Sequence, residues 1–291
     1  MNHKINKVIL PVSLLSIVAS GSYSQTQQPN IVIIHTDEQN FRTLGCYREC
    51  LQNEQAFPWG EEAIVETPNI DYLAHRGVLF TRCYATTPVS SPSRASFMTG
   101  FYPQNNGVWT NDMVLSEKTP TFGESLRDNG YATGYFGKLH LNGKGKPEWH
   151  PKRDFGFSDN FYMYNRGHWK KIEEAEEGPV FRTNADVKTT DEKTFTTDFI
   201  ATRAIDFINQ QKDGPFCCMI CFPDPHSANL VRPPYDTKYS HIKFKEPVTA
   251  TADTTSRPAW SHGDNLPADQ PEDMAQYFGM IKCIDDNIGR I

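Results

Sequence analysis

Apolar residues along this chain gather into short runs that alternate with longer amphipathic stretches. Two runs, 30–35 and 215–222, are mostly apolar, which is typical of strands buried on both faces of a sheet. Shorter runs at 78–84 and 131–136 are also predicted to be strands. The first run leads into Thr36-Asp37-Glu38-Gln39, so it predicts polar side chains at the carboxyl end of a buried strand.

Helices are predicted between these runs from the residues that begin and end them. Glycine follows directly after several of these stretches, where it can end a helix in a left-handed conformation. The predicted helices cover residues 70–75, 93–98, 121–129, 191–211 and 271–287.

This alternation predicts an α/β fold with a largely parallel central sheet and helices on both faces. Residues 142–190 lack a clear period and are rich in glycine, aromatic and charged residues, which favours loops over a site. Residues 223–271 form a proline-rich, polar excursion. A site at the carboxyl ends of the strands is therefore expected.

The composition is that of a folded protein with a large core. The chain has 291 residues, of which 38% are hydrophobic and 22% charged, enough for one large domain or at most two small ones. Its formal net charge of -6 leaves no basic stripe, and it carries no nucleic-acid motif. Nucleic acid is therefore not an expected partner.

The N-terminus resembles a secretory signal. Lys4 and Lys7 precede an apolar stretch over 8–18, and the small residues Ala19-Ser20-Gly21 follow near a plausible cleavage point. Residues 1–24 are predicted to be a signal peptide and 25–291 the mature domain, which is secreted or periplasmic. A buried N-terminal helix is the alternative. The apolar run is too short for a membrane span.

Cysteine usage does not indicate a disulfide scaffold. The seven cysteines are odd in number and irregularly spaced, so at least one is expected to be free or to pair with another chain. Cys218 and Cys221 lie in a predicted buried strand and are interpreted as core thiols. Whether Cys46 and Cys50 pair is left open.

One short segment carries the residues of an anion site. Ser90 lies just before Pro92, which favours the first turn of a helix, where backbone amides and the helix dipole attract an anion. Arg94 is close enough to pair with sulfate or phosphate oxygens. Taken alone, the segment is more typical of an N-capped surface helix.

The wider sequence resembles the sulfatase family, within the alkaline-phosphatase superfamily. Pro88 to Gly100 (PVSSPSRASFMTG) resembles its first signature, and Gly130 to His140 (GYATGYFGKLH) is similar to its second. The remaining similar segments follow in order: residues 30–39, 44–47, 67–80 and 223–226. The resemblance covers nearly the whole mature chain.

The resemblance implies a modified nucleophile and a metal. Ser90 takes the position that a maturation enzyme oxidises to formylglycine, whose hydrated aldehyde attacks sulfur; the family uses Cys or Ser there. Asp37 and Glu38, together with Ser90, would bind a divalent cation, Ca²⁺ or else Mg²⁺. Glu38 departs from the Asp that the family usually has.

The resemblance also implies roles for four basic residues. Arg94 and Lys138 would bind the sulfate, and His140 would orient the nucleophile. His226 would reach the leaving ester oxygen as a hydrogen-bond donor or general acid. The charges of Arg94 and Lys138 would stabilise the transition state.

Part of the family pattern is not found. Members complete the metal site with an Asp-Asn or Asp-His pair and a further Lys, after the helix that resembles 277–291. The chain is therefore expected to be an N-terminal portion of the catalytic domain. Asp285-Asp286-Asn287 is interpreted as helix surface, and Gly263-Asp264-Asn265 is not expected to supply a substitute.

The leading hypothesis is a secreted sulfuric ester hydrolase acting on a sulfated small molecule or glycan. An aromatic-rich insert suits a sugar; it contains Tyr162, Tyr164, Arg166, His168 and Trp169. The alternatives are a phosphate- or phosphonate-ester hydrolase of the same superfamily and an inactive remnant that lacks part of the metal site.

Overall fold

The computed structural model describes residues 28–145, 147–246 and 271–291. The predicted signal peptide and Gly263-Asp264-Asn265 lie outside these ranges. Within them, no helix is both long enough and apolar enough to span a bilayer.

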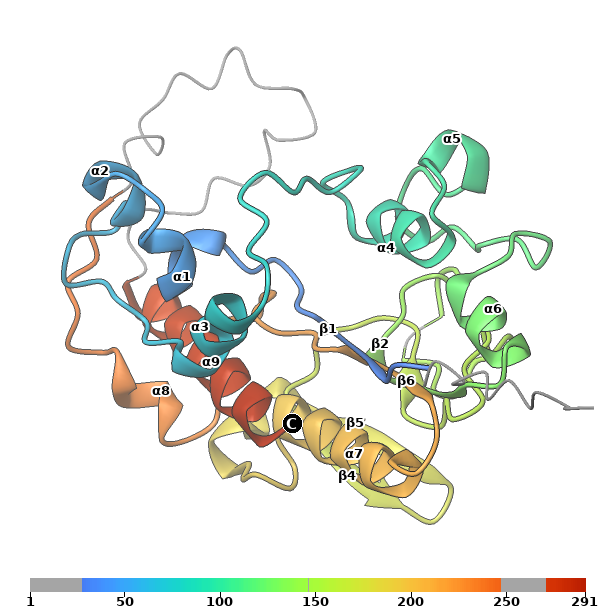
Figure 1. Cartoon of the computed structure of the whole chain (residues 1–291). Coiled ribbons are helices and arrows are strands. Elements are labelled where there is room, and N and C mark those ends of the chain that lie inside the picture. The colour runs from blue at the N-terminus through green and yellow to red at the C-terminus, as the bar shows by residue number, and fades with distance from the viewer. Residues whose placement is uncertain (1–27, 146, 247–270) are drawn as a thin grey trace, which may run out of the picture.

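A four-stranded parallel sheet forms the centre of the fold (Figure 1). Its spatial order is β1 (Ile31–His35), β6 (Phe216–Cys221), β2 (Ala132–Lys138) and β3 (Met163–Tyr164). Parallel pairing places the carboxyl ends of these strands at one edge. The predicted strands at 30–35, 131–136 and 215–222 are thereby confirmed, with β2 extending to Lys138.

Helices connect and cover the strands. The predicted helices are confirmed as α3 (Pro68–Arg76), α4 (Ser90–Thr99), α6 (Phe122–Asp128), α7 (Thr196–Gln211) and α9 (Pro271–Arg290). Shorter helical turns are α1 (Gly45–Arg48), α2 (Asn53–Ala56), α5 (Pro103–Asn106), α8 (Tyr235–Lys238), η1 (Phe41–Thr43) and η2 (Asn184–Thr189). Gly100 ends α4 in the left-handed conformation expected of it.

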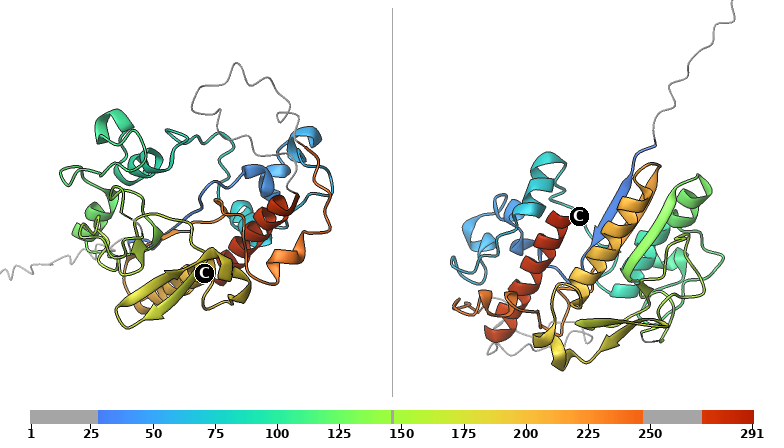
Figure 2. Two further views of the ribbon diagram at one scale, coloured as in Figure 1. Left: turned by 180° about the vertical axis from the view of Figure 1, so that it is seen from behind. Right: turned by 90° about the horizontal axis from the view of Figure 1, so that it is seen from below.

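The core lies on both faces of the sheet. On one face, Met98 of α4 packs with Tyr135 and Met219. On the other, Ile200 of α7 packs with Phe136 and Ile220, and α9 lies alongside α7 and α3 (Figure 2). The sheet is therefore covered by helices on both sides, as the alternation predicts.

Two expectations about strands are wrong. Residues 78–84 form no strand, and Val78, Phe80 and Tyr84 are largely exposed. An isolated apolar run cannot form a strand without a neighbour to pair its backbone, and no described strand lies alongside it. Residues 142–190 are also not all loop, since they contain β3 and an antiparallel hairpin, β4 (Lys171–Ala175) and β5 (Gly178–Arg182).

The interpretation of Asp285-Asp286-Asn287 as helix surface is wrong for Asp285 and Asn287, whereas Asp286 is partly exposed. Asp285 is fully buried, and its Oδ1 accepts hydrogen bonds from the backbone N–H groups of Asn69 (3.0 Å) and Ile70 (2.9 Å). Asn287 is buried too and donates to Asp198. The residues of this α9 segment therefore tie α9 to α3 and α7.

All seven cysteines lie in the described ranges and are free thiols. Cys218 and Cys221 are fully buried in β6, which confirms their interpretation as core thiols. Cys46 and Cys50 form no disulfide; the Cys50 thiol donates to the backbone carbonyl of Cys46 at 3.4 Å.

Replacing Asp285 with alanine should lower the free energy of unfolding by about 2 kcal/mol, because buried N–H groups at the start of α3 lose their acceptor. Denaturant unfolding followed by circular dichroism measures this change. Glu272→Ala, at an exposed position of the same helix, is the control and should stay within about 0.5 kcal/mol of the parent. Equal stability of the two variants would contradict the capping role.

Candidate active site

The predicted site residues come from elements that end at one edge of the sheet. Asp37 follows β1, Lys138 is the last residue of β2, and the segment 223–226 follows β6. The backbone N–H of Asp37 donates to the carbonyl of Asp224 at 3.1 Å, which joins two of these strand ends directly. Topology alone therefore gathers residues that are far apart in sequence.

Ser90 opens helix α4 rather than preceding it. Its Oγ lies 3.0 Å from Nδ1 of His140, as expected for a residue that orients the nucleophile. His140 has a left-handed backbone, with φ of 60°, and its N–H donates to Asn165. This turn directs the imidazole back toward the helix N-terminus, where the dipole favours an anion.

Arg94 and Lys138 are buried together beside one carboxylate. Arg94 donates through Nη1 to the carbonyl of Lys138 at 2.7 Å, and its Nη2 lies 3.4 Å from Oδ2 of Asp37. The Lys138 ammonium forms a short ion pair with the same oxygen. The side chains of Arg94 and Lys138 are only 4% and 1% exposed. Nη2 of Arg94 makes no hydrogen bond within the described residues, so a buried donor remains available.

The charged groups of this cluster shift one another's pKa values. Burial alone would raise the pKa of Asp37, but His168, Arg94 and Lys138 hold it far below its usual range. Burial lowers the pKa of Lys138 to about 8, with Asp37 opposing this effect and Arg94 adding to it. Two cations therefore face one firmly ionised carboxylate.

His168 belongs to the site although the sequence patterns indicate only a sugar-binding insert. Its Nε2 lies 2.7 Å from Nζ of Lys138 and 3.6 Å from Oδ2 of Asp37. Its ring stacks on that of His226, with centroids 3.6 Å apart and planes at 6°. Burial, together with the charges of Lys138 and His226, lowers the pKa of His168 to about 3 despite Asp37.

His226 and Glu38 meet at the more exposed side of the site. Nε2 of His226 lies 3.2 Å from Oε1 of Glu38, and its Nδ1 lies 2.8 Å from the carbonyl of Ser227. Glu38 has a left-handed backbone, with φ of 63°, and its carbonyl accepts from the Tyr277 hydroxyl. This conformation directs the Glu38 carboxylate toward His226, whereas Asp37 faces the cations.

A second ion pair lies beneath His226 and was not predicted. Lys170 and Asp224 are fully buried, 2.5 Å apart, and Thr197 donates to the other Asp224 oxygen at 2.7 Å. The pair joins the 142–190 insert and α7 to the segment that carries His226. In the sequence, only the nearby histidines draw attention to these two positions: His168 lies two residues before Lys170, and His226 two residues after Asp224.

Asp112 is another residue that the sequence patterns miss. It forms an ion pair with Arg166 of the insert, and its Oδ1 lies 3.8 Å from Nε2 of His140. The neighbouring Asn111 accepts from the backbone N–H of Ser91 at 2.9 Å. The loop between α5 and α6 therefore contacts both the start of α4 and the histidine that faces Ser90.

The described residues do not by themselves fit a divalent cation. They contain no cluster of three or more His, Cys, Asp or Glu side chains arranged to hold a metal ion. Asp37 faces cations and Glu38 faces His226, whereas Ca²⁺ takes about six to eight oxygen ligands. The arrangement instead suits an oxyanion, which Arg94 and Lys138 can bind through charge-assisted hydrogen bonds.

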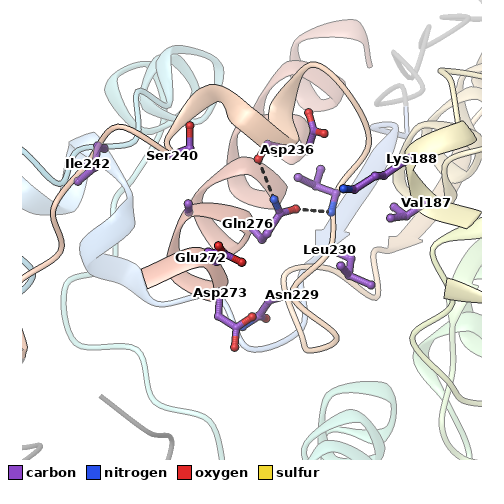
Figure 3. Close-up of a pocket in the computed structure, with 12 residues that line it drawn as sticks. Val187, Lys188, Asn229, Leu230, Asp236, Ser240, Ile242, Glu272, Asp273 and Gln276 are labelled. Atoms are coloured by element: carbon purple, nitrogen blue, oxygen red, sulfur yellow. Dashed lines mark hydrogen bonds between the residues drawn. The ribbon is translucent and has the colours of Figure 1, made fainter. Parts of the chain in front are cut away.

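A separate pocket of about 550 Å³ lies between η2, α8 and α9 (Figure 3). Its wall includes Lys188, Asp236 and Glu272, and none of the predicted site residues lines it. Gln276 closes one side by donating to the Asp236 carbonyl and accepting from the Val231 N–H. The candidate site is therefore not this pocket. It is the group of predicted residues near the carboxyl ends of the strands, called the strand-end cluster from here on: Asp37, Ser90, Arg94, Lys138, His140 and His226.

A family model described as sulfatase matches residues 29–291. The uncharacterized sulfatase YidJ of Escherichia coli is 28% identical over 282 residues, covering 91% of this chain and 53% of that protein. The N-acetylglucosamine-6-O-sulfatase of Bacteroides thetaiotaomicron is 29% identical over 263 residues, covering 88% and 42%. The chain thus spans about half the length of these relatives.

Solved structures agree with the fold. The yidJ sulfatase of Bacteroides fragilis superposes with a TM-score of 0.64 at 26% identity, covering 93% of this chain and 59% of that one. The phosphonate monoester hydrolase of Agrobacterium radiobacter gives 0.64 at 23% identity, covering 90% and 58%, and shows the fold alone. The alkaline-phosphatase-like architecture expected from the sequence is therefore confirmed.

Replacing Lys170 with methionine should lower the free energy of unfolding by about 3–5 kcal/mol, because the Asp224 carboxylate is left buried without a counter-charge. The double variant Lys170→Met, Asp224→Asn removes both charges and should recover part of that loss. Lys193→Met, at an exposed position, is the control. Denaturant unfolding measures these variants and the single variant Asp224→Asn, and a loss in the double variant equal to the sum of the two single losses would contradict the coupling.

Proposed function

The chain belongs to the sulfatase family, and we propose from this premise that it hydrolyses sulfate esters at the strand-end cluster. The observation that supports this most is the pair of buried cations, Arg94 and Lys138, against the single carboxylate of Asp37. One positive charge is left in excess in a buried space beside Ser90. A sulfate monoester carries one negative charge and would balance it.

Ser90 is proposed to supply the nucleophile. A plain serine hydroxyl is weak without an activating base, so we propose its oxidation by a maturation enzyme to formylglycine. One hydroxyl of the aldehyde hydrate attacks sulfur as the ester alcohol leaves, and loss of the proton from the second hydroxyl then expels sulfate and restores the aldehyde. Nδ1 of His140 lies at hydrogen-bond distance from the atom to be modified and would hold its orientation. Arg94 and Lys138 would bind the sulfate oxygens and stabilise the charge that builds up on them.

His226 is proposed to act on the leaving group. Its ring lies about one-quarter exposed at the outer side of the cluster, where the alcohol part of an ester would extend toward solvent. An imidazole there can donate a proton or hydrogen bond to the departing ester oxygen. Oε1 of Glu38, 3.2 Å from Nε2 of His226, can accept a hydrogen bond from this ring and so hold its orientation.

A divalent cation, Ca²⁺ or else Mg²⁺, remains part of the proposal. When bound, it would neutralise charge on the sulfate, and Asp37, Glu38 and the modified Ser90 are its proposed ligands. The described residues supply only part of such an oxygen shell. The proposed roles of Arg94, Lys138, His140 and His226 involve no contact with the cation.

The proposed substrate is a sulfated carbohydrate met outside the cytoplasm. The Bacteroides thetaiotaomicron relative is an N-acetylglucosamine-6-O-sulfatase by name. Arg166 of the insert pairs with Asp112, whose Oδ1 also lies near Nε2 of His140, so a charged side chain of the kind that suits sugar hydroxyls borders the site; Tyr162 instead packs on Phe199 and Arg203 of α7. The predicted signal peptide supports a secreted or periplasmic location.

The second candidate is hydrolysis of a phosphonate ester. It is favoured by the structural similarity to a phosphonate monoester hydrolase, whose fold this chain shares. A phosphonate monoester also carries one negative charge, so the charge of the cluster does not separate it from a sulfate ester. An inactive remnant is the third candidate, and the activity measurements below distinguish it.

Ser90→Ala should abolish sulfate-ester hydrolysis and leave the fold intact, because Ser90 lies at the start of α4 rather than in the core. The matched control is Ser91→Ala, since the Ser91 hydroxyl has no hydrogen-bond partner among residues 28–145, 147–246 and 271–291 and should be dispensable. Peptide mass spectrometry over residues 83–94, after co-expression with a maturation enzyme, should report an aldehyde at Ser90. Turnover that persists in Ser90→Ala would refute the assignment of the nucleophile.

The matured chain should cleave an aryl sulfate faster than the matching aryl phosphate, by at least about tenfold. A phosphate monoester brings nearly two negative charges at neutral pH to a cluster with one positive charge in excess. Steady-state kcat/KM on both esters, and on an aryl phosphonate, is the measurement. Faster phosphate turnover by a chain with unmodified Ser90 would overturn the sulfatase proposal.

A further inference from the structure

His168 touches two residues proposed to act on the substrate, although it lies in no family signature. Its Nε2 is 2.7 Å from the Lys138 ammonium, and its ring lies flat on His226 at 3.6 Å. The side chain is about one-fifth exposed, so it borders the open part of the site rather than filling the core. His168 thus connects the sulfate-binding side of the cluster to the leaving-group side.

The contact with Lys138 sets the form of the imidazole. An ammonium group can only donate, so in the 2.7 Å contact with Lys138 Nε2 of His168 accepts, as the tautomer with its proton on Nδ1 does; Asp37, at 3.6 Å, is beyond hydrogen-bond distance from the same nitrogen. A neutral acceptor differs from a carboxylate in one important way: it holds the ammonium in place without cancelling its charge. Lys138 therefore keeps a positive charge for the substrate even though Asp37 competes for it.

The backbone fixes His168 firmly in this position. Asn184 accepts from the N–H of Lys170 at 2.9 Å and donates to the carbonyl of His168 at 3.3 Å. Gly167 has φ of 119°, and a Cβ there would lie 2.4 Å from the Trp169 ring nitrogen, so glycine is required at this turn. The buried Lys170–Asp224 ion pair also ties this part of the insert to the segment that carries His226.

We propose that His168 is a positioning residue of the anion site, which orients Lys138 by accepting its hydrogen bond and orients His226 by ring stacking. The proposal rests on the proposed function only in naming the anion a sulfate ester. The role of Lys138 in binding an oxyanion can be measured without any turnover.

Two substitutions separate the two contacts. His168→Gln places an amide oxygen near the position of Nε2, so it keeps an acceptor for Lys138 but cannot stack. His168→Phe keeps a flat ring over His226 but has no acceptor. His75→Ala is the control, since His75 is an exposed histidine that pairs with Glu49 away from the site. Thermal unfolding of each variant checks that the fold is kept.

The first measurement is the affinity of the chain with unmodified Ser90 for methyl sulfate, a monoanionic sulfate ester, by isothermal titration calorimetry at constant ionic strength. His168→Phe should bind methyl sulfate about tenfold more weakly, because a hydrogen bond to a charged group is lost. His168→Gln and His75→Ala should bind like the parent. Equal affinity in all four proteins, or equal weakening in His168→Gln and His168→Phe, would overturn the role at Lys138.

The second measurement compares leaving groups. His168→Gln should lose kcat on a sugar sulfate, whose alkoxide needs a proton, while it keeps its KM and its rate on 4-nitrophenyl sulfate, whose phenolate leaves without one. The same loss on both esters would overturn the role at His226. If the parent hydrolyses neither ester, the proposed function fails, and the methyl sulfate affinities still decide the proposal for His168.

Discussion

Two buried cations that share one carboxylate are the interaction on which this site depends. Arg94 and Lys138 would repel each other strongly in a space of low dielectric constant, and Asp37 is the group that lets them be buried together. Because one carboxylate cannot balance both, the cluster is incomplete without an anion. The start of α4 at Ser90 adds partial positive charge at the same place.

The fold holds the three charged side chains together by fixing the strands and the helix that carry them. Parallel strands deliver Asp37 and Lys138 to one edge, and Arg94 reaches in from α4 on the face opposite α7. The Lys170–Asp224 pair then secures the segment after β6. Burying this second pair gains little stability, since desolvation offsets the attraction, but any change of geometry would leave a charge uncompensated. The Lys170–Asp224 pair therefore fixes the position of the segment after β6 more than it adds to the free energy of folding.

Sequence patterns were sufficient for the parts of the molecule that depend on local order. Apolar runs located three strands of the central sheet and glycine marked the end of α4, whereas α4 begins at Ser90 and not at residue 93 as predicted. Sequence patterns failed where the structure or burial of a residue depends on a partner that is distant in the sequence. Residues 78–84 have strand-like composition but no described neighbour, and Asp285 looks like helix surface until α3 packs against it. His168 carried no local signal of its contact with Lys138.

The charge of the cluster also bears on the choice between esters, which the fold alone leaves open. With the His168 ring neutral, Arg94, Lys138 and Asp37 leave one positive charge in excess. A sulfate monoester and a phosphonate monoester both match this charge, whereas a phosphate monoester would add a second negative charge that nothing in the cluster balances. What separates sulfate from phosphonate must then lie in the nucleophile at Ser90 and in the contacts that the insert makes with the alcohol.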